Sequence, residues 1–505
     1  MANDLSAISS WWATLFIFGV AAYPLVDKLL PKWTKYSHLI SKIFGLCAVS
    51  LIVLFFGWTR ILPFEVGSII LAMFLIFSFG FFVNRRPQID SWGILKQEFI
   101  FLSAILLWSW VKGHEPSIHG LEKFMDYGFT QSILNSKFFP PLDMWLAGTN
   151  YINYYYFGHL TMATLTKFSG VGLEYGFNLM LITIFAFCLT LSGSIVHKIT
   201  NKGWIAILIA FLLTLGGNLQ TIYAFTSGYS LSDKVVSPPP FWEIFTGKMD
   251  SNYWYANATR FIPYTIHEFP GYSFVVSDVH GHVLSIPLVL LMLVFLVEGF
   301  YFKRLNLYLT FGIGILGGLL FMTNALDGPI YLGLFIVLLF VSQSSWKERF
   351  KKMGLVIVCF IITVMPLISH FKSFVTGVAM NCPPKFLANT KIGPLLFEGI
   401  EKCQRSPVWM MLLLWGMFVY FGIWHFIKLH QKKNTFISIV FVYSLALILF
   451  AEFFYFKDIY PMHFRSNTMF KLGYQAFILS YIAGGWVVWR MAKAKNWIFG
   501  SLLMP

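Results

Sequence analysis

Two carboxylates separated by four positions are the first residues in this sequence that could do chemistry. Glu122 and Asp126 lie in the segment EKFMDYGF, and residues four apart on a helix share one face. A carboxylate at such a position could deprotonate or orient an acceptor hydroxyl, which makes both residues candidate catalytic bases. The alternative is a solvated amphipathic helix whose Glu122 and Lys123 face water. The spacing alone leaves both interpretations open.

A second candidate set alternates along the segment SDVHGH. In an extended chain, Asp278, His280 and His282 would all point to one face, whereas on a helix only Asp278 and His282 would align. Carboxylate and imidazole groups in this pattern could bind a divalent metal ion, for which we consider Mg²⁺ or Mn²⁺, or they could grip a phosphate. The alternative is that Asp278 caps the following helix and that the histidines lie at the headgroup level.

Three consecutive tyrosines, Tyr154, Tyr155 and Tyr156, form a third candidate, and His159 follows them closely. Successive residues of a helix point about 100° apart, so one helix face does not present all three. We expect them to line an external cavity, where their rings stack on a sugar or a polyprenyl chain and their hydroxyls bond phosphate or sugar. His159 would face the same cavity. The alternative is an aromatic belt at the membrane interface.

Membrane-spanning helices must position these residues. The chain has 505 residues, of which 57% are hydrophobic and only 12% charged, against roughly 25% charged residues in soluble domains. Apolar runs of roughly 17–25 residues indicate α-helical spans rather than a barrel. We predict about thirteen spans, at 9–26, 37–58, 64–83, 95–112, 172–195, 203–225, 282–302, 306–323, 329–344, 352–369, 409–428, 435–452 and 469–490. The shorter apolar segment 154–168 is expected to be re-entrant or juxtamembrane.

The chain carries a formal net charge of +15, and the distribution of its basic residues predicts how it is oriented in the membrane. Most basic residues fall in alternate, short loops, which the positive-inside rule assigns to the cytoplasm. We interpret this charge as a topology signal that contacts anionic lipids, and not as a nucleic-acid surface. The long loops at 113–171, 226–281, 370–408 and 453–468 then lie on the extracytoplasmic side, with most of the carboxylates and histidines. The N-terminus lacks a basic region, so no cleavable signal peptide is expected.

This topology divides the chain into a four-helix segment at 1–112, a first large external loop at 113–171 and a remaining membrane bundle at 172–505. The sequence contains no Walker A motif and no Rossmann glycine pattern. An enzyme working outside the cytoplasm does not draw on cytosolic nucleotides, so it needs an activated substrate that is already in the membrane. A lipid-linked substrate is the usual solution.

Other polar residues of these loops and span ends are candidate substrate contacts. They are Asp143, Arg260, His267, Glu268, Asn324, Asp327, Lys457, Asp458, Arg465 and Lys471. An arginine at the membrane boundary can bind a lipid phosphate through its planar guanidinium, although the same placement is typical of snorkelling side chains. Cys382 and Cys403 share one external loop and could form a disulfide.

Several motifs together resemble a known family. EKFMDYGF, FPPLDMWLAG, NYYYFGH, HEFPGYSFVVSDVHGH, NALDGPIY and the block from FFYFKDIY to RSNTMFKLGYQA are similar, in order, to the signature blocks of a prokaryotic membrane protein family named for its YYY motif. That family, long of unknown function, resembles the GT-C-fold glycosyltransferases, which include protein O-mannosyltransferases, oligosaccharyltransferase catalytic subunits and aminoarabinose transferases. The resemblance implies a polytopic enzyme that uses a polyprenyl-phosphate-linked sugar and an acidic residue of the first large external loop.

We therefore expect a glycosyltransferase of the prokaryotic plasma membrane that is active on its extracytoplasmic face. Glu122 or Asp126 would take the acceptor proton, while Arg465, with Lys457 or Lys471, would neutralise the departing phosphate. The rivals are a transporter or flippase of lipid-linked substrates, which would show inverted repeats and charges within spans, and a non-catalytic protein that binds polyprenyl lipid. A phosphatase or another transferase of lipid-linked substrates also remains open.

Overall fold

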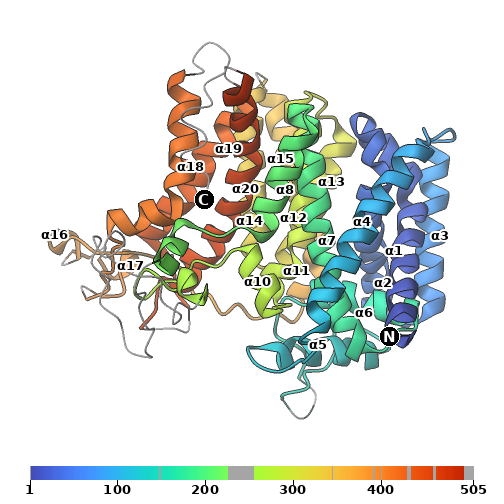
Figure 1. The fold of residues 1–505 in the computed structure, drawn as a ribbon. Helices are drawn as coiled ribbons and strands as arrows, with labels where there is room; N and C mark the ends of the chain where they lie inside the picture. Colours follow the sequence, from blue (N-terminus) through green and yellow to red (C-terminus); the bar gives the residue numbers. More distant parts are fainter. Residues whose placement is uncertain are drawn as a thin grey trace. The chain divides into compact units, whose positions relative to one another are not determined.

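The computed structural model of the chain describes residues 2–225, 255–428 and 434–493, apart from 459–461 and the single positions 147, 149, 344, 389, 392 and 400. Regular structure in these residues is almost entirely helical (Figure 1). Nine helices of this described part are long and apolar enough to cross a membrane, and three shorter apolar helices accompany them. The chain is an all-α membrane protein, which confirms the predicted class.

The predicted spans locate the helices closely. The span at 37–58 coincides with α2 (Ser37–Trp58), and the span at 306–323 differs by one residue from α13 (Leu307–Thr323). The span at 203–225 was predicted too long, because α8 (Gly203–Leu215) ends before two consecutive glycines and the 3₁₀ helix η2 (Leu219–Phe225) follows. Glycine is a poor helix former, which explains the early stop.

The chain folds into two compact units that interleave along the sequence. One comprises Met1–Ile195 with Phe274–Lys372, and the other Val196–Ser273 with Ser373–Pro505. Our division at 1–112, 113–171 and 172–505 followed the order of the sequence and has different boundaries. Hydropathy marks where helices lie, but it carries little information on which of them pack together.

The first unit begins with α1 (Ala2–Leu29), α2, α3 (Val66–Val83) and α4 (Ser91–Gly113). Helix α1 packs against both α2 and α3. The loop after α4 leads into α5 (Lys123–Asn135) and α6 (Phe157–Ser169), which pack against each other. These two short helices carry the first set of candidate residues.

The remaining helices of the first unit follow α7 (Leu173–Thr200), which runs past the unit boundary. They are α11 (Gly281–Leu284), α12 (Ile286–Leu296), the π-helical turn η4 (Val297–Tyr301), α13, α14 (Asp327–Ser342) and α15 (Trp346–Ile368). Helix α6 packs against α1, α2 and α13 of this unit. Its 13 residues extend for about 20 Å, less than the roughly 30 Å of a bilayer core. This length fits our prediction that 154–168 is not an ordinary span.

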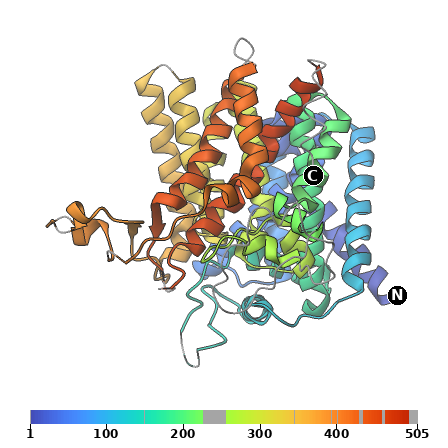
Figure 2. The same ribbon diagram turned by 60° about the vertical axis from the view of Figure 1, so that its left-hand side comes forward.

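The second unit contains α8, the 3₁₀ helix η3 (Tyr255–Thr259), α18 (Val408–Lys428), α19 (Thr435–Phe453) and α20 (Ser466–Lys493). Helix α20 packs against α8, α18 and α19, and Figure 2 shows the last three helices side by side in orange to red. Helix α10 (Pro270–Val276) lies at the boundary with the first unit.

A small module of two strands and two short helices completes the second unit. Strand β1 (Val378–Met380) pairs antiparallel with β2 (Phe454–Phe456), and the short helices α16 (Lys385–Ala388) and α17 (Gly393–Leu396) follow β1. A disulfide joins Cys382 to Cys403, which confirms the predicted pairing.

Candidate functional site

The start of α5 presents two carboxylates with very different exposure. Glu122 precedes the helix, and Asp126 lies in its first turn, where the helix dipole favours an acid. The Glu122 side chain is 66% exposed, whereas that of Asp126 is 1% exposed. Lys123 is buried as well. The solvated-helix interpretation, which placed Glu122 and Lys123 together in water, is therefore wrong for Lys123.

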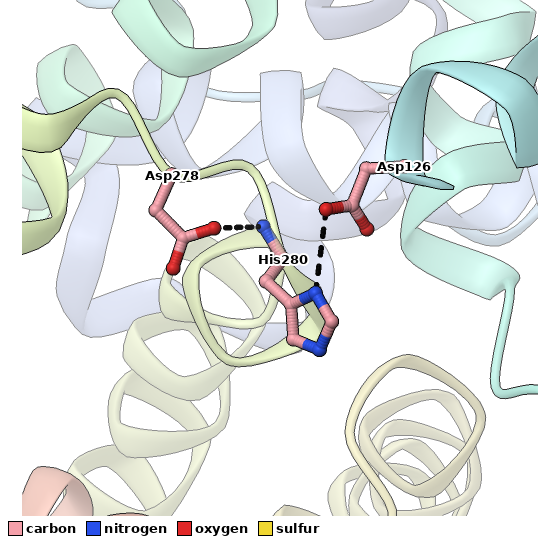
Figure 3. Close-up of side chains that lie close together, drawn as sticks. All are labelled: Asp126, Asp278 and His280. Atoms are coloured by element: carbon pink, nitrogen blue, oxygen red, sulfur yellow. Dashed lines mark hydrogen bonds and ion pairs between the residues drawn. The ribbon is translucent and has the colours of Figure 1, made fainter. Parts of the chain in front are cut away.

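A histidine from a distant part of the sequence faces both carboxylates. The Nδ1 atom of His280 lies 3.3 Å from Asp126 Oδ2 and 3.5 Å from Glu122 Oε2 (Figure 3). The other oxygen of Asp126, Oδ1, lies 2.8 Å from Nε2 of His159, which is fully buried in α6. Asp126 is thus held between two histidines, one from α6 and one from the residue before α11.

These contacts set the protonation of the buried pair. Burial raises the pKa of Asp126, but the charges and hydrogen bonds of His280 and His159 outweigh it and hold that pKa well below its usual range. Burial lowers the pKa of His280, yet the Asp126 carboxylate reverses the effect and raises it to about 10. A carboxyl with a lowered pKa is a weak base, so the exposed Glu122 is the better candidate for accepting a proton.

The three consecutive tyrosines do not share one environment. The Tyr154 hydroxyl lies 2.5 Å from His280 Nε2 and donates a hydrogen bond to the Tyr155 hydroxyl at 3.0 Å. Tyr156 is instead buried near His370, and its hydroxyl has no hydrogen-bond partner among the described residues. Two tyrosines therefore belong to the polar cluster and the third to the interior. That they line a cavity for a sugar or lipid stays a prediction.

Asp278 joins the cluster from the segment before α11. Its Oδ1 accepts a hydrogen bond from the His280 backbone N–H at 3.0 Å, and its Oδ2 lies 3.4 Å from His282 Nε2. The second contact is the four-residue pairing that we expected of a helix. Asp278 thus both shapes the backbone before α11 and belongs to the polar cluster. Burial lowers the pKa of Lys123, while the charges of Asp278 and Glu115 act in the opposite direction.

Two glycines allow the helices that carry the cluster to approach closely. A Cβ on Gly158 would lie 2.7 Å from Leu284 Cβ, and a Cβ on Gly281 would lie 2.6 Å from the Thr323 carbonyl oxygen and 2.8 Å from the Tyr155 ring. A side chain at Gly158 would push α6 away from α11, and one at Gly281 would push α11 away from the end of α13 and from Tyr155. The small residues of the YYYFGH and DVHGH motifs are therefore needed to bring His159 and His280 to one carboxylate.

The other predicted residues of the first unit lie in separate environments. Asp327 is buried at the start of α14 and accepts a hydrogen bond from Ser285 Oγ at 2.5 Å. Asn324 is buried, and neither polar atom of its side chain has a partner among the described residues. Asp143 Oδ1 accepts hydrogen bonds from the backbone N–H groups of Trp145 and Leu146 and so closes a turn.

In the second unit, the predicted arginines are paired with carboxylates. The guanidinium of Arg465 lies 2.9 Å from Glu452 Oε1 and donates to Ser406 Oγ at 3.0 Å, whereas Arg260 pairs with Glu268 at 2.9 Å. Arg465 Nε has no partner among the described residues. Both arginines therefore have structural partners, and their contact with a phosphate stays a prediction.

His267 is a buried histidine of this unit. Neither of its ring nitrogens has a hydrogen-bond partner among the described residues. Burial, followed by the charges of Arg465 and Arg260, lowers its pKa to about 3. Lys457 donates its backbone N–H to the Gly377 carbonyl, and Lys471 lies in α20. Roles for Lys457, Asp458 and Lys471 in substrate binding stay predictions.

A buried charged group within the N-terminal helices was missed by the sequence analysis. Glu98 of α4 lies 2.5 Å from Lys42 Nζ and 2.9 Å from His38 Nδ1, both in α2. Trp12 Nε1 donates to the same carboxylate at 3.0 Å. The available signal was the presence of Lys42 and Glu98 within predicted spans, where a charge is rarely tolerated without a partner.

One group of side chains in the first unit could hold a metal ion. Asp126, Asp278 and His280 each offer one ligand atom, and these atoms lie within 4.8 Å of one another (Figure 3). The predicted trio of Asp278, His280 and His282 shares two residues with this group, and Asp126 takes the third place. Sequence spacing could not reveal this, because 154 positions separate Asp126 from His280.

Comparisons with known proteins place the chain in a family. No curated protein and no solved structure matches it. A family model described as an uncharacterized membrane protein matches residues 48–433 and 419–480, which is most of the chain. The predicted resemblance is thus confirmed at the level of a membrane protein family without an assigned activity. The chain belongs to the uncharacterized membrane protein family DUF2298.

Proposed function

We propose that the protein is a membrane glycosyltransferase that moves a sugar from a polyprenyl-phosphate donor to an acceptor on the extracytoplasmic side. The observation that carries the proposal is the exposed Glu122 beside the buried Asp126–His280 pair. A fixed polar cluster next to an accessible carboxylate is what a proton-accepting site requires. The DUF2298 match supplies the membrane setting but no activity.

Glu122 is the residue to which we assign the proton transfer. It is solvent-accessible, and its carboxylate lies 3.5 Å from His280 Nδ1. Asp126 is enclosed by His159 and His280 and is poorly placed to reach an acceptor. We therefore assign Asp126 a positioning role, in which its charge fixes the His280 ring. The sequence had left Glu122 and Asp126 as alternative catalytic bases, and we now choose Glu122.

The proposed reaction is a single displacement. The acceptor hydroxyl oxygen forms a bond to the anomeric carbon of the sugar, and the bond between that carbon and the phosphate oxygen breaks. Glu122 takes the hydroxyl proton, and polyprenyl phosphate leaves with the bonding electrons. The configuration at the anomeric carbon inverts. General-base help of this kind contributes about 10²–10⁴-fold to a rate.

Two features of the second unit support the proposed setting. The Cys382–Cys403 disulfide lies in the loop at 370–408, and disulfides persist on the oxidising side of a membrane. This fits the extracytoplasmic assignment made from charge. Arg465 is our candidate for the donor phosphate, because an arginine can bind phosphate through parallel N–H groups. In that role it would exchange part of its contact with Glu452 for the ligand.

Native mass spectrometry of the gently extracted protein tests this proposal. A Glu122→Gln variant should retain the donor without consuming it, so we expect it to copurify with an intact polyprenyl-phosphate sugar. The matched control is Glu174→Gln, the same change at an exposed residue in the first turn of α7. It should copurify with the same lipids as the unmodified protein. Bulk phospholipid alone in all three samples would contradict the proposal.

A second candidate function rests on the buried Glu98 group. Ionisable side chains inside membrane helices often mark a transport pathway, and Glu98, Lys42 and His38 form such a group between α2 and α4. This observation favours a transporter of lipid-linked substrates. In that case, Glu98→Gln would abolish movement of a fluorescent polyprenyl phosphate across vesicles, while Glu122→Gln would leave that movement unchanged.

A further inference from the structure

We propose that Asp126, Asp278 and His280 bind one divalent transition-metal ion. These residues come from α5 and from the segment before α11, and their ligand atoms lie within 4.8 Å of one another. Figure 3 shows the two carboxylates on either side of the His280 backbone and ring. The inference concerns binding alone, so it does not depend on the proposed glycosyl transfer.

The distance at Nδ1 of His280 suits shared ligation of one ion as well as it suits a long hydrogen bond. A hydrogen bond between an N–H group and a carboxylate is about 2.7–2.9 Å long when either partner is charged. The Asp126 Oδ2 atom lies 3.3 Å from Nδ1. Two atoms that bind one ion at about 2.1 Å lie about 3.0–3.4 Å apart in octahedral or tetrahedral geometry. The separation of Asp126 and His280 is thus compatible with two neighbouring ligands of one ion. The third ligand atom, from Asp278, lies within 4.8 Å of the other two and would move inward on binding, since two ligands of one ion at about 2.1 Å lie at most about 4.2 Å apart.

Each proposed ligand also has an outer partner that fixes its orientation. His280 Nε2 lies 2.5 Å from the Tyr154 hydroxyl, so Nε2 can keep a proton donated to Tyr154 when a bound ion replaces the proton that Nδ1 otherwise shares with Asp126. Metal-binding histidines almost always use their second nitrogen in this way. This contact is independent of the carboxylates, because it uses the ring nitrogen that does not face Asp126.

The carboxylates have outer partners of their own. Asp126 Oδ1 contacts His159 Nε2 at 2.8 Å, which leaves Oδ2 toward His280. Asp278 Oδ2 lies 3.4 Å from His282 Nε2. The YYYFGH motif therefore supplies two supporting side chains, Tyr154 and His159, and His282 contacts the Asp278 carboxylate. Outer contacts of this kind help to fix the orientation of metal ligands.

The ligand types select the class of ion. One imidazole and two carboxylates suit Mn²⁺ or Zn²⁺, whereas Mg²⁺ prefers oxygen ligands and holds its water tightly. This narrows the sequence expectation of Mg²⁺ or Mn²⁺ to a first-row transition ion. Three protein ligands would leave further coordination positions for water or an anionic group of a substrate.

Manganese binding to the full chain in lipid nanodiscs tests the site. After chelator treatment and buffer exchange, Mn²⁺ is titrated in, and the unbound ion is counted by electron paramagnetic resonance. We expect one bound Mn²⁺ per chain. Zn²⁺ should displace it, whereas equimolar Mg²⁺ should displace no more than a small fraction. Asp126→Asn, Asp278→Asn and His280→Gln should each weaken binding at least about tenfold. Tyr154→Phe should also weaken it, by about 10–100-fold, because the Tyr154 hydroxyl orients the His280 ring.

The control is Asp143→Asn, an identical change in the same external loop whose carboxylate closes the turn at Trp145. Its affinity for Mn²⁺ should stay within about threefold of the unmodified protein. Asp278→Asn guards against misfolding, since Asp278 is less buried than Asp126. Absence of stoichiometric Mn²⁺ and Zn²⁺ binding in the unmodified protein would overturn the inference. Equal losses in the Asp143 and Asp126 variants would also overturn it.

Discussion

The buried His267 makes the stability of the protein depend on acidity in a calculable way. Its pKa is about 3 in the folded chain, against the ordinary value of 6.5. Between these values the unfolded chain binds a proton that the folded chain does not, so stability falls as the pH drops below 6.5 and stops falling near pH 3. From pH 7 to pH 5, the linkage relation gives a loss of about 2 kcal/mol from this residue.

Replacing His267 with glutamine removes the titrating group and should remove that loss. The assay compares reversible denaturation in detergent at pH 7 and pH 5 for both proteins. We expect the variant to lose about 2 kcal/mol less than the unmodified protein across this interval. The reasoning would be refuted if both proteins lost equal free energy, or if the imidazole of His267, followed by NMR, titrated near pH 6.5.

Three further predictions concern packing and charge. Glu98→Gln leaves Lys42 buried without its counter-charge and should lower the stability of the protein by about 3–5 kcal/mol. Adding Lys42→Met to that variant should restore most of the lost stability, measured by thermal melts. Gly281→Ala should cost about 1–3 kcal/mol through the contact with the Thr323 carbonyl, whereas Gly354→Ala, whose Cβ position is open, should cost almost nothing. Cys403→Ser opens a disulfide between residues 21 positions apart and should lower stability by about 3 kcal/mol, measured with and without reductant.

The helices could be predicted from the sequence because lipid imposes a simple rule. A segment in the hydrocarbon core must satisfy its backbone hydrogen bonds internally and must be apolar, so spans such as 37–58 are visible directly. The end of α8 at Leu215 was missed because the apolar residues interspersed in the segment 219–225 extend the hydropathy signal past Gly216 and Gly217. A hydropathy average detects apolar residues but does not detect where the backbone leaves the helix.

The site could be predicted only in parts. Glu122 and Asp126 were expected to share a face, and both do lie beside His280. Their different burial was not visible, because it depends on α6 and α11 packing over Asp126. The link between Asp126 and His159 spans 33 positions, and that to His280 spans 154. Such contacts are set by tertiary packing through Gly158 and Gly281, which a local pattern does not encode.

Donor turnover by the purified protein tests the central claim most directly. The protein in lipid vesicles is supplied with a panel of polyprenyl-phosphate sugars, together with an extract of its own membranes as the source of the acceptor hydroxyl. Mass spectrometry follows the conversion of each donor to bare polyprenyl phosphate. Our account predicts turnover of at least one donor, reduced at least about 100-fold by Glu122→Gln and unchanged by the control Glu174→Gln. Turnover that survives Glu122→Gln undiminished, or a panel in which every donor remains intact, would contradict it.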